Sequence, residues 1–373
     1  MKILVVNPTV YSIYHLRGEL LQALTDLGHT VVAVGPEPEK EVDLSYLGVQ
    51  YRCVSFRRTS KNPFADFFVI AHLKKVIEEE APDLVFSYAL KPVAYGSIAA
   101  RLAKVPRIYS MISGLGKVYS GGSYKTRLLQ VITNALLKRG FSACERVIFQ
   151  NRDDREELIR RGLLPAEKCR LVSGSGVSLE KFQPAPMPKS PVFLMITRLL
   201  REKGVMEFCK AARLAHQRCP QARFQIGGFF DEHPGELSMS DLRPYLESGD
   251  VEYLGKLQNV VPYLGGCTTY VLPSYYREGI PHSILEAMAV GRPIITTDCP
   301  GCRETVQDGV NGILVRPRNV EDLADAFCRL TEDAALRERM GQESLRYCRE
   351  RFDVSIVNRD MLSILGLQQE GSL

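Results

Sequence analysis

The stretch Glu278-Gly279-Ile280-Pro281-His282-Ser283-Ile284-Leu285-Glu286 decides how the second half of this 373-residue chain is built. Its last residues open an apolar run that predicts a buried helix. Pro281 suits the first helical position, where no N–H is needed, and Gly291 suits the position just past the end. Glu278 is therefore expected in the loop before the helix, and Glu286 on the second turn.

The start of this helix is a candidate anion site. Free N–H groups and the positive end of the helix dipole favour a group such as phosphate. A carboxylate on each side could accept hydrogen bonds from hydroxyl groups, which suits a sugar nucleotide. The same spacing also fits an ordinary amphipathic helix with one solvated glutamate, and spacing alone does not choose between the two.

Strands alternate with helices along the chain, which predicts parallel sheets covered on both faces. In the first half we expect strands at 2–6, 30–34, 84–87, 107–111 and 146–150, with helices at 16–27, 67–80 and 93–103. The pattern restarts after a Pro-rich stretch, with strands at 192–197, 223–226, 269–272 and 293–297 and helices at 205–217, 284–290 and 320–330.

This pattern predicts two doubly wound α/β domains, 1–183 and 192–350. We expect a linker at 184–191 between them and a C-terminal helix and tail at 351–373, with the helix crossing back to the first domain. Ligands of such sheets bind at the carboxyl ends of the strands, which predicts a site in a cleft between the domains.

Composition excludes several classes of protein. With 45% hydrophobic and 24% charged residues, the chain has the make-up of a soluble globular protein. No apolar run approaches the roughly 20 residues that span a bilayer. The first residues predict a strand rather than a signal peptide, so the ten cysteines are expected to be reduced thiols in the cytoplasm.

Charge is unevenly distributed along the chain. Residues 1–189 hold 27 Lys and Arg against 18 Asp and Glu, whereas the rest holds 21 against 25. The excess of positive charge suggests that the first domain meets an anionic surface or substrate, although random scatter is the alternative. No nucleic-acid-binding motif accompanies it.

Other residues of the second half could hold a diphosphate. Arg198 and Lys203 follow a strand, where cations can neutralise phosphate or form a solvated basic loop. Gly227-Gly228 could let the backbone approach a ligand or simply make a turn. Gly255-Lys256 ends a short strand and could present backbone amides to a nucleobase.

Together these residues resemble the retaining GT-B glycosyltransferases of family 4, over essentially the whole chain. The resemblance rests on Arg198 with Lys203-Gly204, Tyr253-Leu254-Gly255, Leu272-Pro273-Ser274, the Glu278–Glu286 segment, Ala287-Met288-Ala289 and Gly291 with Pro293. It is narrowed by Ser12–Arg17, Asn62-Pro63-Phe64, Gly114-Leu115-Gly116 and Asp298–Cys302. These look like the PglA-type N-acetylgalactosaminyltransferases that extend polyprenyl-diphosphate-linked sugars in bacterial glycan assembly.

The resemblance implies a role for each matching residue. Arg198 and Lys203 would hold the donor diphosphate and stabilise the leaving group, Glu286 would bind the ribose and Glu278 the transferred sugar. The backbone from Gly279 and Ile280 through Pro281 and His282 to Ser283 would meet phosphate or sugar, and Gly255, Lys256, Gly227 and Gly228 would lie around the nucleotide. His282 could equally be a surface histidine.

The first domain departs from the broader family in two places. The usual Gly-Gly loop after the first strand is replaced by Asn7–Ser12, and the Gly114 loop lacks the histidine that faces the sugar in many members. His15 could substitute for it or be structural. The candidates on the acceptor side are Tyr14, His15, Arg17, Ser113, Gly114, Leu115 and Gly116.

A membrane-facing surface is also expected. Lys117, Tyr119, Lys125, Arg127, Leu128 and Leu129 mix cations with apolar side chains, and Arg57, Arg58 and Lys61 form a second basic group. Such a face predicts docking on the cytoplasmic side of the bacterial inner membrane, although a helix with a solvated basic side would look similar.

No resident metal or cofactor is expected. No two Asp residues are separated by a single residue, so the chain has no DxD motif. Positively charged side chains are therefore expected to replace the divalent cation that a DxD motif would bind. Cys299-Pro-Gly-Cys302 supplies only two thiols and more simply shapes a loop beside the donor site.

The expected reaction is transfer of a hexose or N-acetylhexosamine, GalNAc from UDP-GalNAc being the best candidate, to a polyprenyl-diphosphate-linked sugar. The resemblance implies attack on the front face of the sugar, and nothing requires a carboxylate nucleophile. Three alternatives stay open: a GT-B-fold UDP-sugar epimerase, a retaining transferase with a soluble acceptor, and a noncatalytic sugar-nucleotide-binding module.

Overall fold

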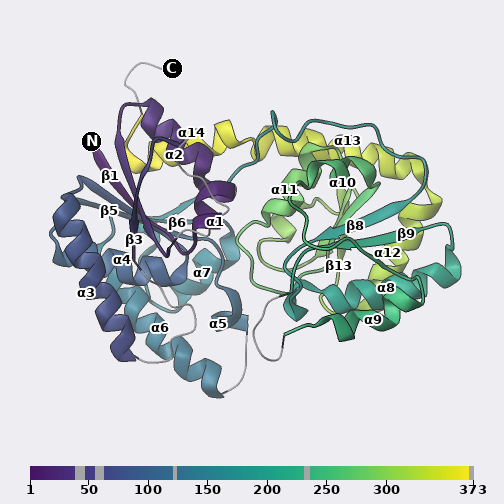
Figure 1. The fold of residues 1–373 in the computed structure, drawn as a ribbon, viewed down its shortest axis with the longest axis horizontal. Helices are drawn as coiled ribbons and strands as arrows, with labels where there is room; N and C mark the ends of the chain where they lie inside the picture. Colours follow the sequence, from purple (N-terminus) through teal and green to yellow (C-terminus); the bar gives the residue numbers. More distant parts are fainter. Residues whose placement is uncertain (38–46, 55–62, 121–123, 231–235, 369–373) are drawn as a thin grey trace. The chain divides into compact units, whose positions relative to one another are not determined.

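The structure is a computed structural model that describes residues 1–37, 47–54, 63–120, 124–230 and 236–368 (Figure 1). The chain divides into two compact units, one made of Met1–Ser175 with Ser355–Leu373 and the other of Gly176–Val354. Each unit is built on its own parallel sheet. In the part of the chain that is described, no helix is both long and apolar enough to cross a bilayer.

The first unit contains a seven-stranded sheet in the order β3-β2-β1-β4-β5-β6-β7. Its strands are β1 (Lys2–Val6), β2 (Thr30–Gly35), β3 (Gln50–Cys53), β4 (Leu84–Tyr88), β5 (Arg107–Ile112), β6 (Arg146–Phe149) and β7 (Cys169–Leu171). The order reverses between β1 and β4. In this class of sheet, ligands bind beside such a switch point, at the carboxyl ends of the strands.

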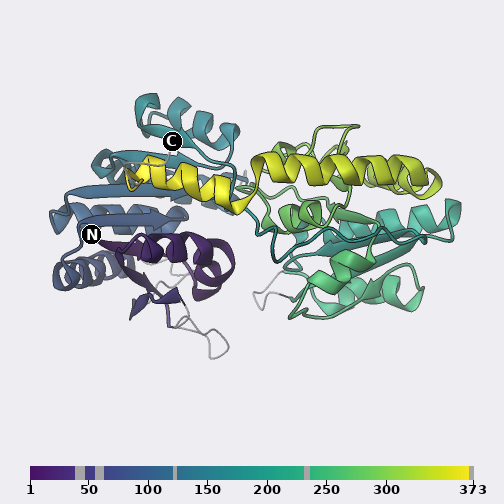
Figure 2. The ribbon, with the colours of Figure 1, turned by 90° about the horizontal axis from the view of Figure 1, so that it is seen from above.

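Helices cover both faces of this sheet (Figures 1 and 2). They are α1 (Val10–Ser12), η1 (Ile13–Arg17), α2 (Gly18–Asp26), α3 (Pro63–Glu80), α4 (Leu90–Leu102), α5 (Gly116–Ser120), α6 (Tyr124–Ala143), α7 (Arg152–Arg160), η3 (Ala166–Lys168) and α14 (Val354–Leu365). Neighbouring residues of a strand point to opposite faces. Val5 accordingly belongs to the core cluster that contains Met361 of α14, whereas Val6 belongs to the cluster that contains Val93 of α4. The expected return of the C-terminal helix to the first domain is confirmed.

The second unit contains a six-stranded sheet in the order β10-β9-β8-β11-β12-β13. Its strands are β8 (Val192–Ile196), β9 (Arg223–Gly227), β10 (Glu252–Tyr253), β11 (Thr269–Leu272), β12 (Ile294–Thr297) and β13 (Gly312–Val315). Its helices are η4 (Arg201–Lys203), α8 (Val205–Arg218), α9 (Met239–Glu247), α10 (Val261–Gly266), α11 (His282–Ala289), η5 (Arg303–Thr305), α12 (Val320–Glu332) and α13 (Ala334–Arg351). The switch point lies between β8 and β11, so the loops after these two strands are the expected place for a ligand.

The two units divide at Ser175 and Gly176, before the Pro-rich stretch 184–191. Phe182 lies in the core of the second unit. The buried Arg292 donates hydrogen bonds to the carbonyls of Ala185 and Pro186, at 3.0 and 3.1 Å. These bonds make the Pro-rich stretch part of the second unit rather than a free spacer.

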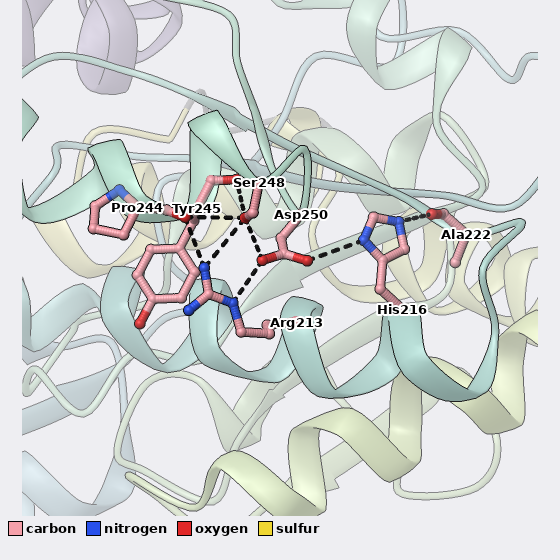
Figure 3. A network of polar contacts seen from close by, with 7 residues as sticks. All are labelled: Arg213, His216, Ala222, Pro244, Tyr245, Ser248 and Asp250. Atoms are coloured by element: carbon pink, nitrogen blue, oxygen red, sulfur yellow. Dashed lines mark hydrogen bonds and ion pairs between the residues drawn. The ribbon is translucent and has the colours of Figure 1, made fainter.

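A polar network fixes α8 to the turn after α9 (Figure 3). Asp250 accepts hydrogen bonds from Arg213 Nε at 2.6 Å and Ser248 Oγ at 2.5 Å, and His216 Nδ1 lies 3.4 Å away. The other ring nitrogen of His216 lies 2.8 Å from the Ala222 carbonyl. Burial alone would raise the pKa of Asp250, but the hydrogen bonds from Ser248, Arg213 and His216 outweigh it and leave the pKa below its ordinary value.

Replacing Asp250 tests this network. We expect Asp250→Asn to lower the free energy of unfolding by about 1–3 kcal/mol at neutral pH, because Arg213 and His216 lose their anionic partner; this figure allows for the partial exposure of Arg213. The control is Asp325→Asn, which breaks the exposed pair with Arg218 on the same helix and should change stability little.

The loss should also depend on pH. Because the pKa of folded Asp250 is depressed, its contribution is complete above the pKa of an unfolded aspartate, about 4, and disappears as the pH falls through the folded value. The gap between wild type and Asp250→Asn should therefore shrink at about pH 3 in urea unfolding. Equal losses for the Asp250 and Asp325 variants at neutral pH would contradict the account.

Candidate active site

The helix expected from the Glu278–Glu286 segment is present as α11. It begins at His282, one residue later than expected, because Pro281 is the N-cap and its carbonyl accepts the hydrogen bond from Ile284 N at 3.1 Å. Glu286 lies on the second turn, as expected. Because α11 follows β11, its amino-terminal end lies at the switch-point edge of the sheet.

Lys203 and Glu278 form an ion pair at this edge. Lys203 Nζ contacts Glu278 Oε1, and the two side chains are only 14% and 11% exposed. Ser274 Oγ donates a hydrogen bond to the same carboxylate oxygen at 3.0 Å. Lys203 Nζ also lies 5.5 Å from the centre of the Tyr276 ring. The loops after β8 and β11 thus join a cation, a carboxylate and a hydroxyl beside the start of α11.

The Glu202 carbonyl holds these two loops together. It accepts hydrogen bonds from Tyr275 N at 2.9 Å and Tyr276 N at 3.1 Å, and Ser274 Oγ, whose one proton is donated to Glu278, lies 3.3 Å away. These bonds fix η4, which carries Lys203, against the loop that carries Glu278. Glu202, Ser274 and Tyr276 were not among the site residues expected from the sequence. The available signal was the position of Ser274, between the end of β11 and Glu278.

Arg198 and the glycines lie in neighbouring loops. Arg198 follows β8 after Thr197 and is half-buried. Gly228, which follows β9, has a φ of 145°, and a Cβ there would lie 1.8 Å from the Thr197 carbonyl oxygen. Glycine is therefore required by contact between two loops of the protein, whatever the ligand. Gly227 is the last residue of β9.

The loop after β10 is attached to the same edge. Gly228 N donates a hydrogen bond to the Gly255 carbonyl at 2.8 Å. Lys256 is exposed, with Nζ 5.9 Å from the centre of the Phe229 ring, and Phe229 is itself 44% exposed. Phe229 is thus an exposed aromatic side chain beside Lys256, one of the residues expected to bind the base. Phe229 itself was not expected from the sequence.

The first turns of α11 engage their own partners. His282 Nδ1 lies 3.1 Å from Glu286 Oε1, so this histidine has a carboxylate beside it. The buried hydroxyl of Tyr270 donates a hydrogen bond to the Ile196 carbonyl at 2.8 Å, and burial raises its pKa. Ser283, expected to meet phosphate, lies on the first turn of α11. Gly279 and Ile280 lie in the loop between Glu278 and α11.

The Cys299–Cys302 loop lies against the backbone of this site. Gly301 has a φ of 84°, and a Cβ there would lie 2.0 Å from the Gly279 carbonyl oxygen. Burial, and then the nearby charge of Glu278, raises the pKa of Cys302 to about 12, which disfavours the reactive thiolate. The loop therefore acts as a brace for the residues after Glu278.

The acceptor-side candidates belong to the first unit. Tyr14, His15 and Arg17 lie on η1 after β1, where the His15 ring packs 4.1 Å from that of Tyr11 and 4.7 Å from that of Tyr14. Ser113, Gly114 and Leu115 follow β5, and Gly116 begins α5. All of them lie after the carboxyl ends of strands.

The residues expected to face a membrane differ in their exposure to solvent. Lys117, Arg127, Leu128 and Leu129 are exposed. The expectation that Tyr119 faces the membrane is wrong, because this residue is buried. Its hydroxyl donates a hydrogen bond to Asn134 at 2.5 Å, and its ring packs under Arg161. It therefore cannot face a membrane. The side chain of Lys125 and the residues Arg57, Arg58 and Lys61 lie outside the part of the chain that is described.

Comparison with protein families divides the chain much as its fold does. Residues 17–174 match the model described as Glycosyl transferase 4-like domain, and residues 178–346 match Glycosyl transferases group 1.

Two curated relatives illustrate the similarity. The chain is 33% identical over 354 residues to the N,N'-diacetylbacillosaminyl-diphospho-undecaprenol alpha-1,3-N-acetylgalactosaminyltransferase of Campylobacter jejuni, covering 90% of this chain and 92% of that one. It is 28% identical to the UDP-Gal:alpha-D-GlcNAc-diphosphoundecaprenol alpha-1,3-galactosyltransferase of Escherichia coli, covering 73% and 72%.

Solved structures show the same fold. Anabaena Alr3699/HepE, in complex with UDP and glucose, superimposes with a TM-score of 0.78 at 17% identity, covering 99% of this chain and 100% of that one. Sucrose-phosphate synthase from Thermosynechococcus elongatus gives a TM-score of 0.78 at 20% identity, with 98% of each chain covered. The expected GT-B fold class is confirmed. With family models matched on both halves and a relative aligned over nearly its whole length, this chain belongs to the GT-B glycosyltransferases and is a hexosyltransferase.

Proposed function

We propose that this enzyme is a retaining, metal-independent glycosyltransferase that moves GalNAc from UDP-GalNAc to a polyprenyl-diphosphate-linked sugar in bacterial surface-glycan or glycoprotein assembly. The observation that carries the proposal is the Lys203–Glu278–Ser274 cluster beside the start of α11 at the switch point. The similarity to the Campylobacter N-acetylgalactosaminyltransferase, which acts on an undecaprenol-diphosphate-linked sugar, supports the choice of sugar and acceptor.

The switch-point residues suit the parts of a sugar nucleotide. Arg198, Lys203 and the amino-terminal end of α11 supply positive charge for the diphosphate. Glu286 is assigned to the ribose hydroxyls and Glu278 to the hydroxyls of the transferred sugar. In this assignment both partners of the Lys203–Glu278 ion pair contact the same donor. Lys203 would bind its diphosphate, and Glu278 would bind its transferred sugar.

The chemistry follows from these charges. The bond between the anomeric carbon and the diphosphate oxygen breaks, so negative charge develops on the leaving UDP. Fixed positive groups aimed at developing charge are usually the largest catalytic contribution. Lys203 is held in place by its neighbours before the reaction begins. In this proposal the leaving phosphate accepts the acceptor's proton on the front face, and no protein nucleophile is assigned.

Metal independence is supported by the chain's own residues. The sequence has no DxD pattern, and Arg198 and Lys203 are cations in the segment that follows β8 at the switch point. We therefore assign to these side chains the role that a divalent cation plays in DxD enzymes.

The acceptor's lipid calls for a membrane surface, and α6 offers an apolar face for one. Its exposed apolar residues are Tyr124 (83%), Leu128 (56%), Leu129 (50%), Val131 (65%) and Ile132 (43%). Phe67 and Phe68 of α3 are also exposed, at 69% and 71%, and the sequence analysis missed them. With the exposed cations Lys117 and Arg127, this face suits an anionic bilayer. We propose peripheral docking on the cytoplasmic face of the inner membrane.

Kinetics of three variants test the donor site. Lys203→Ala and Glu278→Ala should each lower the rate of GalNAc transfer by at least about tenfold with EDTA present, because each removes a contact to the reacting donor. Glu286→Ala should mainly raise the KM for UDP-GalNAc, because the ribose contact is uniform through the reaction.

The exposed Lys210 on α8 provides the matched control, and Lys210→Ala should leave both constants within about twofold of wild type. Near-native turnover of the Lys203 and Glu278 variants, with the fold intact by circular dichroism, would refute the site. Loss of all transfer in EDTA would refute metal independence. Release of an epimerised UDP-sugar without acceptor would indicate an epimerase.

Vesicle binding tests membrane docking. The enzyme should bind vesicles of anionic lipid at low salt and dissociate as salt is raised, because screening weakens surface attraction. Leu128→Ser with Val131→Ser should weaken binding severalfold, since the apolar face is lost. Leu214→Ser, at a 37%-exposed position on α8, should not. Absence of cosedimentation at low salt would disprove docking.

A further inference from the structure

The carboxylate of Glu278 has two donors on one oxygen, and they differ in how firmly each is held. Lys203 Nζ contacts Oε1, and Ser274 Oγ donates a hydrogen bond to the same atom at 3.0 Å. A lysine carries its charge at the end of a flexible four-carbon stem. A serine hydroxyl is attached directly to Cβ, so it is the more rigid of the two contacts.

Ser274 is built into the edge of the second sheet. It is fully buried and lies two residues after the end of β11. Its carbonyl accepts a hydrogen bond from Thr297 Oγ1 on the neighbouring strand β12. Its Oγ accepts another from Tyr276 N at 3.2 Å. Because these bonds fix Ser274 in place, the sheet itself directs the hydroxyl at Glu278, as a precise site requires.

The two donors also differ in what the reaction asks of them. In the structure the Lys203 ammonium contacts Glu278, and in the proposed function it also binds the donor diphosphate. An ammonium that turns toward the diphosphate holds the carboxylate less firmly. Ser274 has no assigned contact with the donor, so its hydroxyl can keep its place. A hydrogen bond from a hydroxyl to a carboxylate is charge-assisted and roughly twice as strong as a neutral one.

We propose that Ser274 is a positioning residue for the reaction. Its hydroxyl holds the Glu278 carboxylate in place for the transferred sugar while Lys203 engages the diphosphate. The inference rests on the proposed function, which assigns Glu278 to the sugar hydroxyls. Ser274 acts through Glu278 and needs no contact with the donor. Loss of its hydroxyl should therefore slow the reaction without weakening nucleotide binding.

Removal of this hydroxyl leaves the loop attached to the rest of the unit. Tyr276 N also donates to the Glu202 carbonyl at 3.1 Å, so it keeps an acceptor in Ser274→Ala. The bond from Thr297 ends on the backbone carbonyl of residue 274 and does not need the side chain. The substitution therefore removes a contact to Glu278 and preserves the main-chain connection between η4 and the loop after β11.

Steady-state kinetics of Ser274→Ala test this role, with UDP-GalNAc as the donor and a polyprenyl-diphosphate-linked sugar as the acceptor. The variant should lower kcat by about tenfold, the size expected for one hydrogen bond to a charged group. The KM for UDP-GalNAc, and the affinity for UDP measured by calorimetry, should stay within about twofold of wild type. The matched control is Thr296→Val, which removes another fully buried hydroxyl, bonded to the Leu272 carbonyl at 2.7 Å, and should leave kcat within about twofold.

A double variant separates positioning from structural support. If Ser274 acts through Glu278, adding Ser274→Ala to Glu278→Ala should lower kcat by no more than about twofold, because the group that it positions is already gone. A further tenfold loss in the double variant would show a structural role and overturn the proposal. Near-wild-type kcat in Ser274→Ala, a parallel loss of its UDP affinity, or an equal loss of kcat in Thr296→Val would overturn it as well.

The wild-type enzyme distinguishes failure of this inference from failure of the proposed function. GalNAc transfer by wild type, combined with a normal kcat in Ser274→Ala, would keep the function and reject the positioning role. Turnover of a different UDP-sugar by wild type would reject GalNAc as the transferred sugar. The same comparison of variants on that donor would then decide the role of Ser274.

Discussion

The second unit depends on one backbone carbonyl, that of Glu202. Two backbone N–H groups of the loop after β11 donate hydrogen bonds to it, and they attach that loop to η4, which follows β8. Without this connection Lys203 and Glu278 would be side chains of separate loops. With it they form a largely buried ion pair beside the start of α11. The preorganised charge that we assign to catalysis is thus a result of main-chain hydrogen bonding at the switch point.

The sequence predicted the elements well because their signals are local. Pro281, the apolar run and Gly291 marked α11 to within one residue. Runs of consecutive apolar residues likewise marked β1 in the first unit and β8 in the second. Contacts between distant residues could not be predicted in this way. Lys203 and Glu278 are 75 residues apart, and nothing in their spacing shows that they pair.

The differences between expectation and structure have specific physical causes. The Pro-rich stretch looked like a spacer, but the buried Arg292 binds its carbonyls and makes it part of the second unit. Tyr119 looked like a membrane residue, but Asn134 and Arg161 provide it with partners inside the first unit. In both places, polar side chains from other elements of the fold contact groups that the local sequence pattern marks as exposed to solvent.

The most direct measurement of the central claim is a crystal structure of the enzyme with UDP bound. The account predicts that the diphosphate lies at the carboxyl ends of β8 and β11, with its oxygens about 3 Å from Lys203 Nζ and the ribose beside Glu286. A nucleotide bound at any other edge of either sheet, with the Lys203–Glu278 pair untouched, would contradict it.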